Sequence, residues 1–547
     1  MPVGFATIVP GLAAQDVVLP AFAAFQAARV EFAQEVAKLA LPADPVASRN
    51  ATAPGGTFEV DGPEKVLAAL EASFSLMPEL RALLDDLAPA VRENAMLAIG
   101  RLCGLSDKLH GQIAEIDTLG VAVSTIGTGA SPALIQAALF LLHTAVRSSA
   151  EVAQTAVDRN ALGALCERLE DTDSSTKIGC IWCLAAIASH DATLAGAVVE
   201  SGSLPLLLLC LKESSLPLRR LTLSCLGSIA KHSKALAEVV NKEGGVTATL
   251  GFLASKDVLL RRQTCRMLAC ALQHHDGAVE WVPAASRAHV IETMHTFATV
   301  DPETCVFAAT LVQQIAKRSA SAAAGLHDLG VVPLLVAHIA AGAASPAPAA
   351  AALGHICDAV PAAAAVAIEQ GVLEAILPVL SSLAPVHICA VMCAALGAMA
   401  AADESAAVHI PASRLVHLMA ESTLLSKRKM GTPTRALVRT GFSKTLSRCS
   451  DYASLVFLIE ALPLTGPDAD AVVLAALLKA LARLLSAKGS LRLDFMQRGA
   501  LTLAQDVAKS SSSDLREALK ALNSTFPAQM VAATDPNYEQ RLLEKIS

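Results

Sequence analysis

A short apolar run recurs along this chain of 547 residues at an almost constant interval. The copy from Leu226 to His232 is preceded by one 42 residues earlier, Leu184 to His190, and followed by one 42 residues later, Leu268 to His274. The first position of the run continues in steps of 41 to 44 residues, at Ile99, Leu142, Leu184, Leu226, Leu268, Val312, Leu353 and Leu396. A fixed period of this size indicates a solenoid, in which stacked repeats share one continuous core.

Within one period the sequence predicts one short helix and two longer ones. Pro205 to Leu211 is an apolar helix, Lys212 to Pro217 is a polar turn, and a wide apolar face from Leu218 to Ile229 indicates a helix between neighbours. Ser233 to Asn241 supplies the short segment. A small turn residue precedes one helix of most periods: Gly120, Asn160, Gly202, Gly244, Gly330, Gly371 and Gly499. This layout predicts an all-α fold, a right-handed armadillo-repeat superhelix (α-solenoid) of about ten units.

The composition is that of thin helical layers. Hydrophobic residues make up 53% of the chain but aromatic residues only 3%, so small and medium side chains must fill the core. The net charge of −7 and the pI of about 6.1 argue against nucleic-acid binding by the whole chain, which needs a basic field. The segment from Ile339 to Ile368 is broken by prolines and is predicted to be buried helix and turn rather than membrane span.

The cysteines favour a reducing compartment. All 13 are scattered over helical patterns without regular pairing, and residues 1–10 lack the charged start of a signal peptide. Cys180 and Cys183 form a CxxC, but without a second pair we expect core thiols. His190, His232 and His274 recur one period apart, too far to share a metal; we expect them near helix C-termini, where the dipole favours them.

We expect four segments along the chain. Residues 1–63 form an N-terminal helix and a Pro/Gly-rich loop, with an apparent insertion at 42–62; residues 64–420 hold the regular repeats; residues 421–512 hold degenerate repeats with a basic segment; and residues 513–547 form a C-terminal helix and tail. The glycine expected near 286 is missing, which predicts an irregular repeat, and Trp281 and Val282 there are candidates for an exposed self-association patch.

The candidate partner-binding residues are mostly basic. Lys177, Arg219 and Arg261 are one period apart at predicted starts of the third helix, with Arg220 and Arg262 beside the last two, and they would form a basic ladder for an acidic partner. A second group lies in a stretch without acidic residues, from Leu424 to Ser450: Lys427, Arg428, Lys429, Arg435 and Arg439. For both groups a solvated helix face is the alternative. Few aromatics accompany the second group, which argues against single-stranded nucleic acid.

Other kinds of site are not indicated. No phosphate-binding glycine loop and no nucleophile elbow is present, so we predict no enzyme activity, no cofactor and no metal. An import-type groove needs repeated Trp and Asn, whereas the positions one period on either side of Trp182 hold Phe140 and Ser224.

The chain resembles the armadillo family of the ciliary central apparatus, called sperm-associated antigen in animals and paralysed-flagella protein in algae. The resemblance is carried by Phe22 to Phe32, by repeat motifs such as Ala98 to Leu102 and Ile229 to Val240, and by the closing stretch Asn523 to Val531. That stretch continues to Pro536-Asn537-Tyr538 and Leu542-Leu543, which adds Tyr538 as a candidate contact. The insertion and the eroded repeat indicate a divergent member.

The resemblance implies a structural scaffold of the axonemal central apparatus, in the cytoplasm and cytoskeleton of motile cilia and flagella. The implied partners are other central-apparatus armadillo proteins and tubulin of the central-pair microtubule, with homo- or heterodimer formation and without nucleic acid or membrane. The alternative is a soluble armadillo adaptor for signalling, trafficking or protein import.

Overall fold

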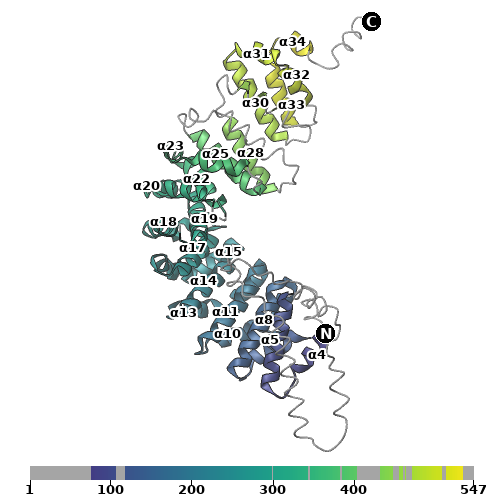
Figure 1. Ribbon diagram of the computed structural model, residues 1–547, viewed down its shortest axis with the longest axis vertical. Helices are drawn as coiled ribbons and strands as arrows, with labels where there is room; N and C mark the ends of the chain where they lie inside the picture. Colours follow the sequence, from purple (N-terminus) through teal and green to yellow (C-terminus); the bar gives the residue numbers. More distant parts are fainter. Residues whose placement is uncertain are drawn as a thin grey trace, which may run out of the picture. The chain divides into compact units, whose positions relative to one another are not determined.

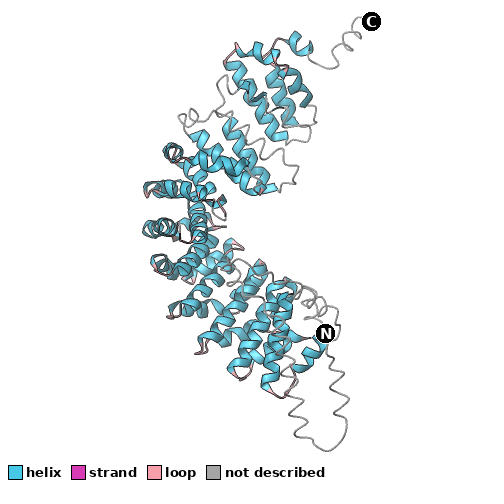
Figure 2. Ribbon diagram, viewed as in Figure 1, coloured by secondary structure: helices cyan, strands magenta, loops and turns pink. Residues whose placement is uncertain are grey.

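The computed structural model describes residues 76–105, 117–298, 300–342, 345–381, 385–402, 432–446, 455–456, 458–459, 462, 471–507 and 513–533. The chain divides into two compact units, Met1–Thr249 and Leu250–Ser547, and each is considered by itself (Figure 1). Every regular element in the described ranges is a helix, as Figure 2 shows. The expectations for residues 1–63, including the insertion at 42–62, lie outside the described residues.

Three kinds of helix alternate along the chain. The long third helices are α5 (Pro89–Leu105), α8 (Pro132–Ser148), α11 (Ser174–His190), α14 (Leu216–Ala230), α17 (Val258–Leu272), α19 (Pro302–Arg318), α22 (Ala347–Ala359), α25 (Val386–Ala402), α28 (Thr432–Leu446), α30 (Ala471–Ala487) and α33 (Ser513–Asn523). The short first helices are α9 (Ala150–Asp158), α12 (Ala192–Glu200), α15 (Lys234–Lys242), η4 (Asp276–Trp281), α20 (Ala320–Asp328), α23 (Ala362–Glu369) and α31 (Leu491–Gln497). The second helices are α7 (Thr118–Gly127), α10 (Ala161–Leu169), α13 (Ser203–Lys212), α16 (Gly245–Leu250) with η3 (Gly251–Ala254), α18 (Ala284–Phe297), α21 (Val331–Ala340), α24 (Val372–Ser381) and α32 (Ala500–Val507). Helices α4 (Leu76–Leu83) and α34 (Ala528–Ala533) stand at the two ends of this series.

The first helices begin at a periodic set of N-caps. Ser149, Asp191, Ser233 and Ser319 each accept a hydrogen bond from a backbone N–H of the following first turn. Such caps satisfy one of the otherwise unpaired donors at a helix start and contribute about 1 kcal/mol each. At the corresponding place between Ser233 and Ser319 stands His275, which provides no side-chain cap, and a 3₁₀ helix, η4, follows. The loss of the cap explains why the predicted irregular repeat departs from the pattern here.

The turn before most second helices uses the left-handed backbone region. Gly202, Gly244, Gly330, Gly371 and Gly499 have φ between 66° and 88°, and Asn160 has φ 62°. These six predicted turn residues are therefore confirmed, because a Cβ is disfavoured in this region for most residue types. The prediction for Gly120 is wrong: Asp117, three residues earlier, takes the left-handed conformation with φ 50°.

The repeat marker found in the sequence lies at the centre of the core. All eight marker positions sit on third helices and are at most 1% exposed: Ile99, Leu142, Leu184, Leu226, Leu268, Val312, Leu353 and Leu396. Consecutive third helices pack on one another, α5 on α8 on α11 on α14 in the first unit and α17 on α19 on α22 on α25 on α28 in the second. The all-α solenoid predicted from the period is thereby confirmed, and its repeats have the three-helix armadillo layout.

The self-association patch expected at the irregular repeat is not formed. Val282 is fully buried, and Trp281 is half-buried with its ring 5.0 Å from the imidazole of His275. Pro283 then begins α18, which at 14 residues is longer than the other second helices. In this repeat a longer second helix that follows a proline replaces the glycine turn and shorter helix of the other repeats.

The described residues at the end of the second unit are mostly helical. The C-terminal helix expected within residues 513–547 is α33, and a turn at Gly499 separates α31 from α32. Phe526, in the closing stretch that carries the family resemblance, is 7% exposed and stacks on Phe495 at 5.8 Å. This stretch therefore covers the last repeat. The four predicted segment boundaries stay predictions.

No single described helix is long and apolar enough to cross a bilayer, although three sharply bent helix pairs satisfy the criteria by length and composition. The Ala-rich segment predicted to be buried helix and turn includes α22 and α23. Six of their alanines are fully buried: Ala349, Ala350, Ala352, Ala363, Ala364 and Ala367.

Candidate protein-binding site

In the first unit, the residues of the predicted basic ladder form ion pairs and hydrogen bonds with other residues of the chain. Lys177, at the start of α11, forms a 2.6 Å ion pair with Glu213 after α13, and this hydrogen bond raises the pKa of the lysine. Arg219, one period later, donates from Nε to the carbonyl of Leu211 at 3.1 Å, where α13 ends. Arg220 is half-buried and also takes part in an interaction within the chain. Lys177 and Arg219 therefore both connect the start of a third helix, α11 and α14 respectively, to the end of the second helix α13.

The ladder residues of the second unit have similar contacts. Arg261 is 7% exposed, donates from Nε to the carbonyl of Ser255 and from Nη1 to Thr293 Oγ1 at 3.3 Å, and lies over the ring of Phe297. Arg262 reaches from α17 to the start of α19, where its Nη2 bonds both carboxylate oxygens of Asp301 at 2.8 Å. The contacts give each ladder residue a role inside its unit, and binding of a partner by them stays a prediction.

The second basic group is only partly described. Arg435 is exposed and Arg439 is half-buried, both on α28. Lys444 of the same helix pairs with Asp358 of α22 at 2.5 Å. The candidates Lys427, Arg428, Lys429 and Tyr538 lie outside the described residues.

The histidine series has a structural role. His190 Nε2 lies 2.6 Å from the carbonyl oxygen of Val146, and His232 Nε2 lies 2.8 Å from that of Ala188. Each acceptor is in the last turn of the third helix of the preceding repeat. The expectation of a helix C-terminus is confirmed, but the helix is that of the neighbouring repeat, so the periodic imidazole ties successive repeats together.

The CxxC is part of the core. Cys180 and Cys183 are fully buried, burial raises the pKa of the Cys180 thiol to about 12, and Cys183 Sγ donates to the carbonyl of Leu139 at 3.4 Å. Twelve cysteines are described, and all twelve are free thiols. Among the described residues no group of three or more His, Cys, Asp or Glu is placed to hold a metal ion.

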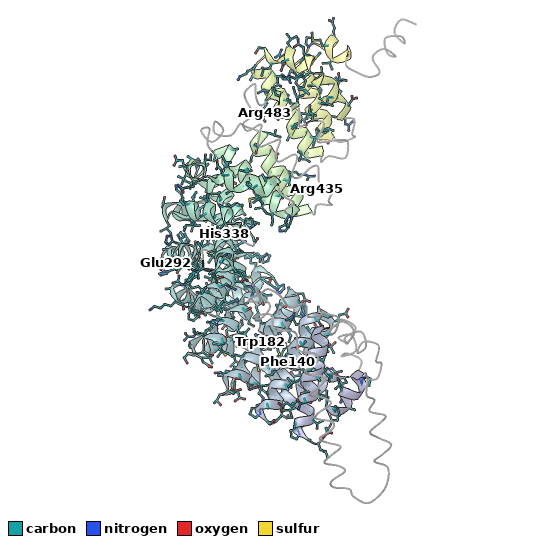
Figure 3. The ribbon with its side chains drawn as sticks, in the orientation of Figure 1. Phe140, Trp182, Glu292, His338, Arg435 and Arg483 are labelled. Atoms are coloured by element: carbon teal, nitrogen blue, oxygen red, sulfur yellow. The ribbon has the colours of Figure 1, made fainter. Side chains whose placement is uncertain are left out.

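The most distinctive feature of the third-helix surface in the first unit is an exposed tryptophan. Trp182, on α11, is 48% exposed, and its ring stacks on His143 of α8 with centroids 5.6 Å apart and an angle of 30° between the planes. Phe140, one period before Trp182, packs against Gly100, where a Cβ would lie 2.8 Å from its ring (Figure 3). Trp182 rests instead on an imidazole and stays at the surface. We call Trp182, His143 and Phe140 the aromatic surface.

The charge beside this surface is positive. Burial lowers the pKa of His143, and the positive charge of Arg147 lowers it further, so the imidazole is neutral at pH 7. Arg147 itself is exposed at the end of α8 and has no ion-pair partner among the described residues. The arrangement presents a large apolar ring next to a cation, which suits an apolar or acidic group of a partner and disfavours a lysine.

Comparison with known proteins supports the fold. No protein-family model matches the chain, and no curated protein matches it. Among solved structures, an engineered protein from a structural genomics consortium is 18% identical, covering 82% of this chain and 98% of its own, with a TM-score of 0.60. A designed armadillo repeat protein in complex with the peptide (KR)4 is 15% identical over 44% of this chain and 100% of its own, with a TM-score of 0.41. At these identities the similarity extends to the fold alone.

The sequence pattern singled out the basic residues and passed over the aromatic surface. In the sequence Trp182 is an isolated aromatic residue, and no pattern points to His143. A usable signal was present: an exposed Trp needs a position on the third helix away from its core stripe, and Trp182 stands two residues before the fully buried marker Leu184.

Proposed function

We propose that this chain is a non-enzymatic scaffold of the axonemal central apparatus in motile cilia or flagella, where it holds other proteins and the central-pair microtubule. Two kinds of support come together. The family resemblance, carried by the opening helix, the repeat motifs and the closing stretch, indicates the ciliary location. The stacked third helices supply the surface on which partners would be held.

The observation that carries the binding role is the exposure of Trp182. Tryptophan is among the residues most enriched at the energetic centres of protein interfaces, because a large apolar ring gains much from desolvation. Here the ring is held in one orientation by its stack on His143, so little side-chain entropy remains to be lost on binding. The aromatic surface is therefore a preorganised anchor for a protein partner.

The solenoid suits a scaffold for a mechanical reason. Within each unit neighbouring repeats pack through their third helices, and the His190 and His232 bonds add directional ties between repeats of the first unit. Such an array presents a long surface to several partners and yields along its length under load.

The test is retention of tagged protein on axonemes. In flagellated cells we expect the wild-type chain to remain with detergent-stripped axonemes after a moderate salt wash, and Trp182→Ala to be retained several-fold less. The matched control is Leu209→Ala, which removes a 57% exposed apolar side chain from α13, a second helix. This control should be retained like the wild type.

The alternative is a soluble adaptor for signalling, trafficking or import. Recovery of wild-type protein in the soluble fraction, with axonemes lacking it, would reject the scaffold and favour this reading. Equal retention of all three proteins would keep the location and reject the aromatic surface as the anchor.

A further inference from the structure

The second unit contains an open groove on its last third helices. It has a volume of ≈ 1050 Å³ and is lined by Ser443 and Leu446 of α28, residues of α30 from Ala476 to Ala487, and Glu517, Ala521 and Ser524 at the end of the chain's last long helix. Its size is at the upper end of the range of small-molecule pockets, and its openness favours a polymer segment over a small ligand.

Two cations in the groove carry its charge. Lys479 and Arg483, both on α30, are exposed, and neither has an ion-pair partner in the ranges that the structure describes. Among the described residues, Arg483 donates to the carbonyl of Leu446, at 3.3 Å from Nη2 (Figure 3 labels Arg483). Like charges four residues apart on one helix face destabilise an isolated helix by a few tenths of a kcal/mol. The pair therefore costs the fold a little and is available to a ligand.

The groove continues along α28 toward further positive charge. Residues 435, 439, 443 and 446 follow helical spacing and share one stripe of this helix. Ser443 and Leu446 line the groove, so the same stripe leads to Arg439 and Arg435, two residues predicted to bind a partner. Neither α28 nor α30 contains an acidic residue. Among the described residues of the lining, the single carboxylate is that of Glu517.

The rest of the lining favours a peptide. Alanine and serine predominate, so a partner backbone can approach the helices closely, and the hydroxyls of Ser443 and Ser486 can bond its amides. None of the lining residues that the structure describes is aromatic, although stacking is the usual means of holding single-stranded nucleic acid. The net charge of the chain is −7, which opposes a general polyanion site.

We infer that this groove binds an extended acidic peptide segment, with its carboxylates on Lys479 and Arg483 and its chain running toward Arg439. The inference deepens the proposed function by assigning one site to an acidic partner segment, and its test needs no cilium. Glu517 repels carboxylates at one end of the groove, so the bound segment has an uncharged residue there.

The experiment measures fluorescence anisotropy of a fluorescein-labelled twelve-residue peptide of alternating Glu and Ser with the purified full chain. We expect Lys479→Glu with Arg483→Glu to weaken binding by about tenfold or more, and Glu517→Gln to strengthen it two- to threefold. Binding should weaken with added salt. Because Glu517→Gln increases affinity, it cannot be explained by misfolding.

The matched control is Lys256→Glu with Lys317→Glu, which makes the same change in net charge at exposed positions that lie outside the lining and on none of the helices that form the groove. This control should bind within twofold of the wild type. Equal losses in both double variants, or no loss in either, would overturn the inference. So would tighter binding of a twelve-nucleotide single-stranded DNA than of the peptide. If the wild-type chain is not retained on axonemes but the groove still binds the peptide, the ciliary scaffold is rejected and the groove remains a peptide-binding site.

Discussion

Arg262 should stabilise the second unit by joining two repeats. Its guanidinium bonds both oxygens of Asp301 at 2.8 Å, Glu303 at 2.7 Å and the hydroxyl of Thr304 at 3.1 Å. The side chains of Arg262 and Asp301 are 17% and 19% exposed, whereas Glu303 is 59% exposed. A hydrogen bond to a charged group contributes about 1.5–3 kcal/mol when solvent is largely excluded, and an exposed ion pair adds less than about 1 kcal/mol. We expect Arg262→Ala to lower the free energy of unfolding by about 2–3 kcal/mol.

The two tryptophans make this measurable. Trp182 belongs to the first unit and Trp281 to the second, in η4, which packs on both α17 and α19. In a Trp182→Phe background, urea unfolding followed by Trp281 fluorescence reports on the repeats that Arg262 joins. The control is Glu292→Ala, also in the second unit, whose contact with His289 is 3.2 Å long and exposed on both sides, and which should change stability by under about 0.5 kcal/mol. If Arg262→Ala changes stability no more than this control, the network is not stabilising and the reasoning is refuted.

The same network predicts a pH dependence. Burial raises the pKa of Asp301, but hydrogen bonds from Thr304 and Arg262 lower it by more, so the pKa lies below its usual value. A carboxyl with a lower pKa in the folded state stabilises the fold above its unfolded pKa of about 4, and this contribution is lost as the pH falls through the folded value. The difference between wild type and Arg262→Ala should therefore be full at pH 7 and should shrink below about pH 4.

Three further predictions concern the first unit. Leu226→Ala should lower the free energy of unfolding by about 2–5 kcal/mol, because the side chain is fully buried, whereas an effect below about 1 kcal/mol in urea unfolding would contradict its place in the core. His232→Ala should cost about 1 kcal/mol by removing the bond to the Ala188 carbonyl, and amide exchange should show earlier opening between the two repeats; unchanged exchange would contradict the tie. Cys180 and Cys183 should resist a thiol reagent at pH 8 until urea is added, because the pKa of Cys180 is raised to about 12 and that of Cys183 lies well above its usual value; rapid labelling of the native chain would contradict their burial.

Much of the fold can be predicted from the sequence because every repeat of a solenoid needs the same buried positions and the same turns. The period located Leu226 and its equivalents, which are the centre of the core, and the turn residues that take the left-handed conformation. The prediction for Gly120 failed because a glycine does not by itself show that the backbone turns at that residue. The left-handed conformation is taken by Asp117 instead. The N-caps Ser149, Asp191 and Ser233 were equally periodic and equally readable, and their interruption at His275 gives the irregular repeat a physical cause.

The binding surfaces were harder to read, because periodicity favours structural roles. Every repeat has the same unpaired carbonyls at its helix ends, so side chains that satisfy them recur at the same interval. Arg219 and His232 are of this kind: both are periodic, and both bond backbone carbonyls at helix ends. Their recurrence in the sequence is therefore explained without a partner.

Specific recognition of a partner requires side chains that do not recur from repeat to repeat. A partner of defined sequence distinguishes one repeat from the next only through side chains that are not repeated. Trp182 is exposed where its equivalent Phe140 is half-buried, and Lys479 and Arg483 place two cations on one face of a helix that is otherwise apolar apart from one serine. Each of these departures has a cost, either exposed apolar area or like-charge repulsion. In a repeat protein, the residues that break the pattern at a cost are the ones to test first for function.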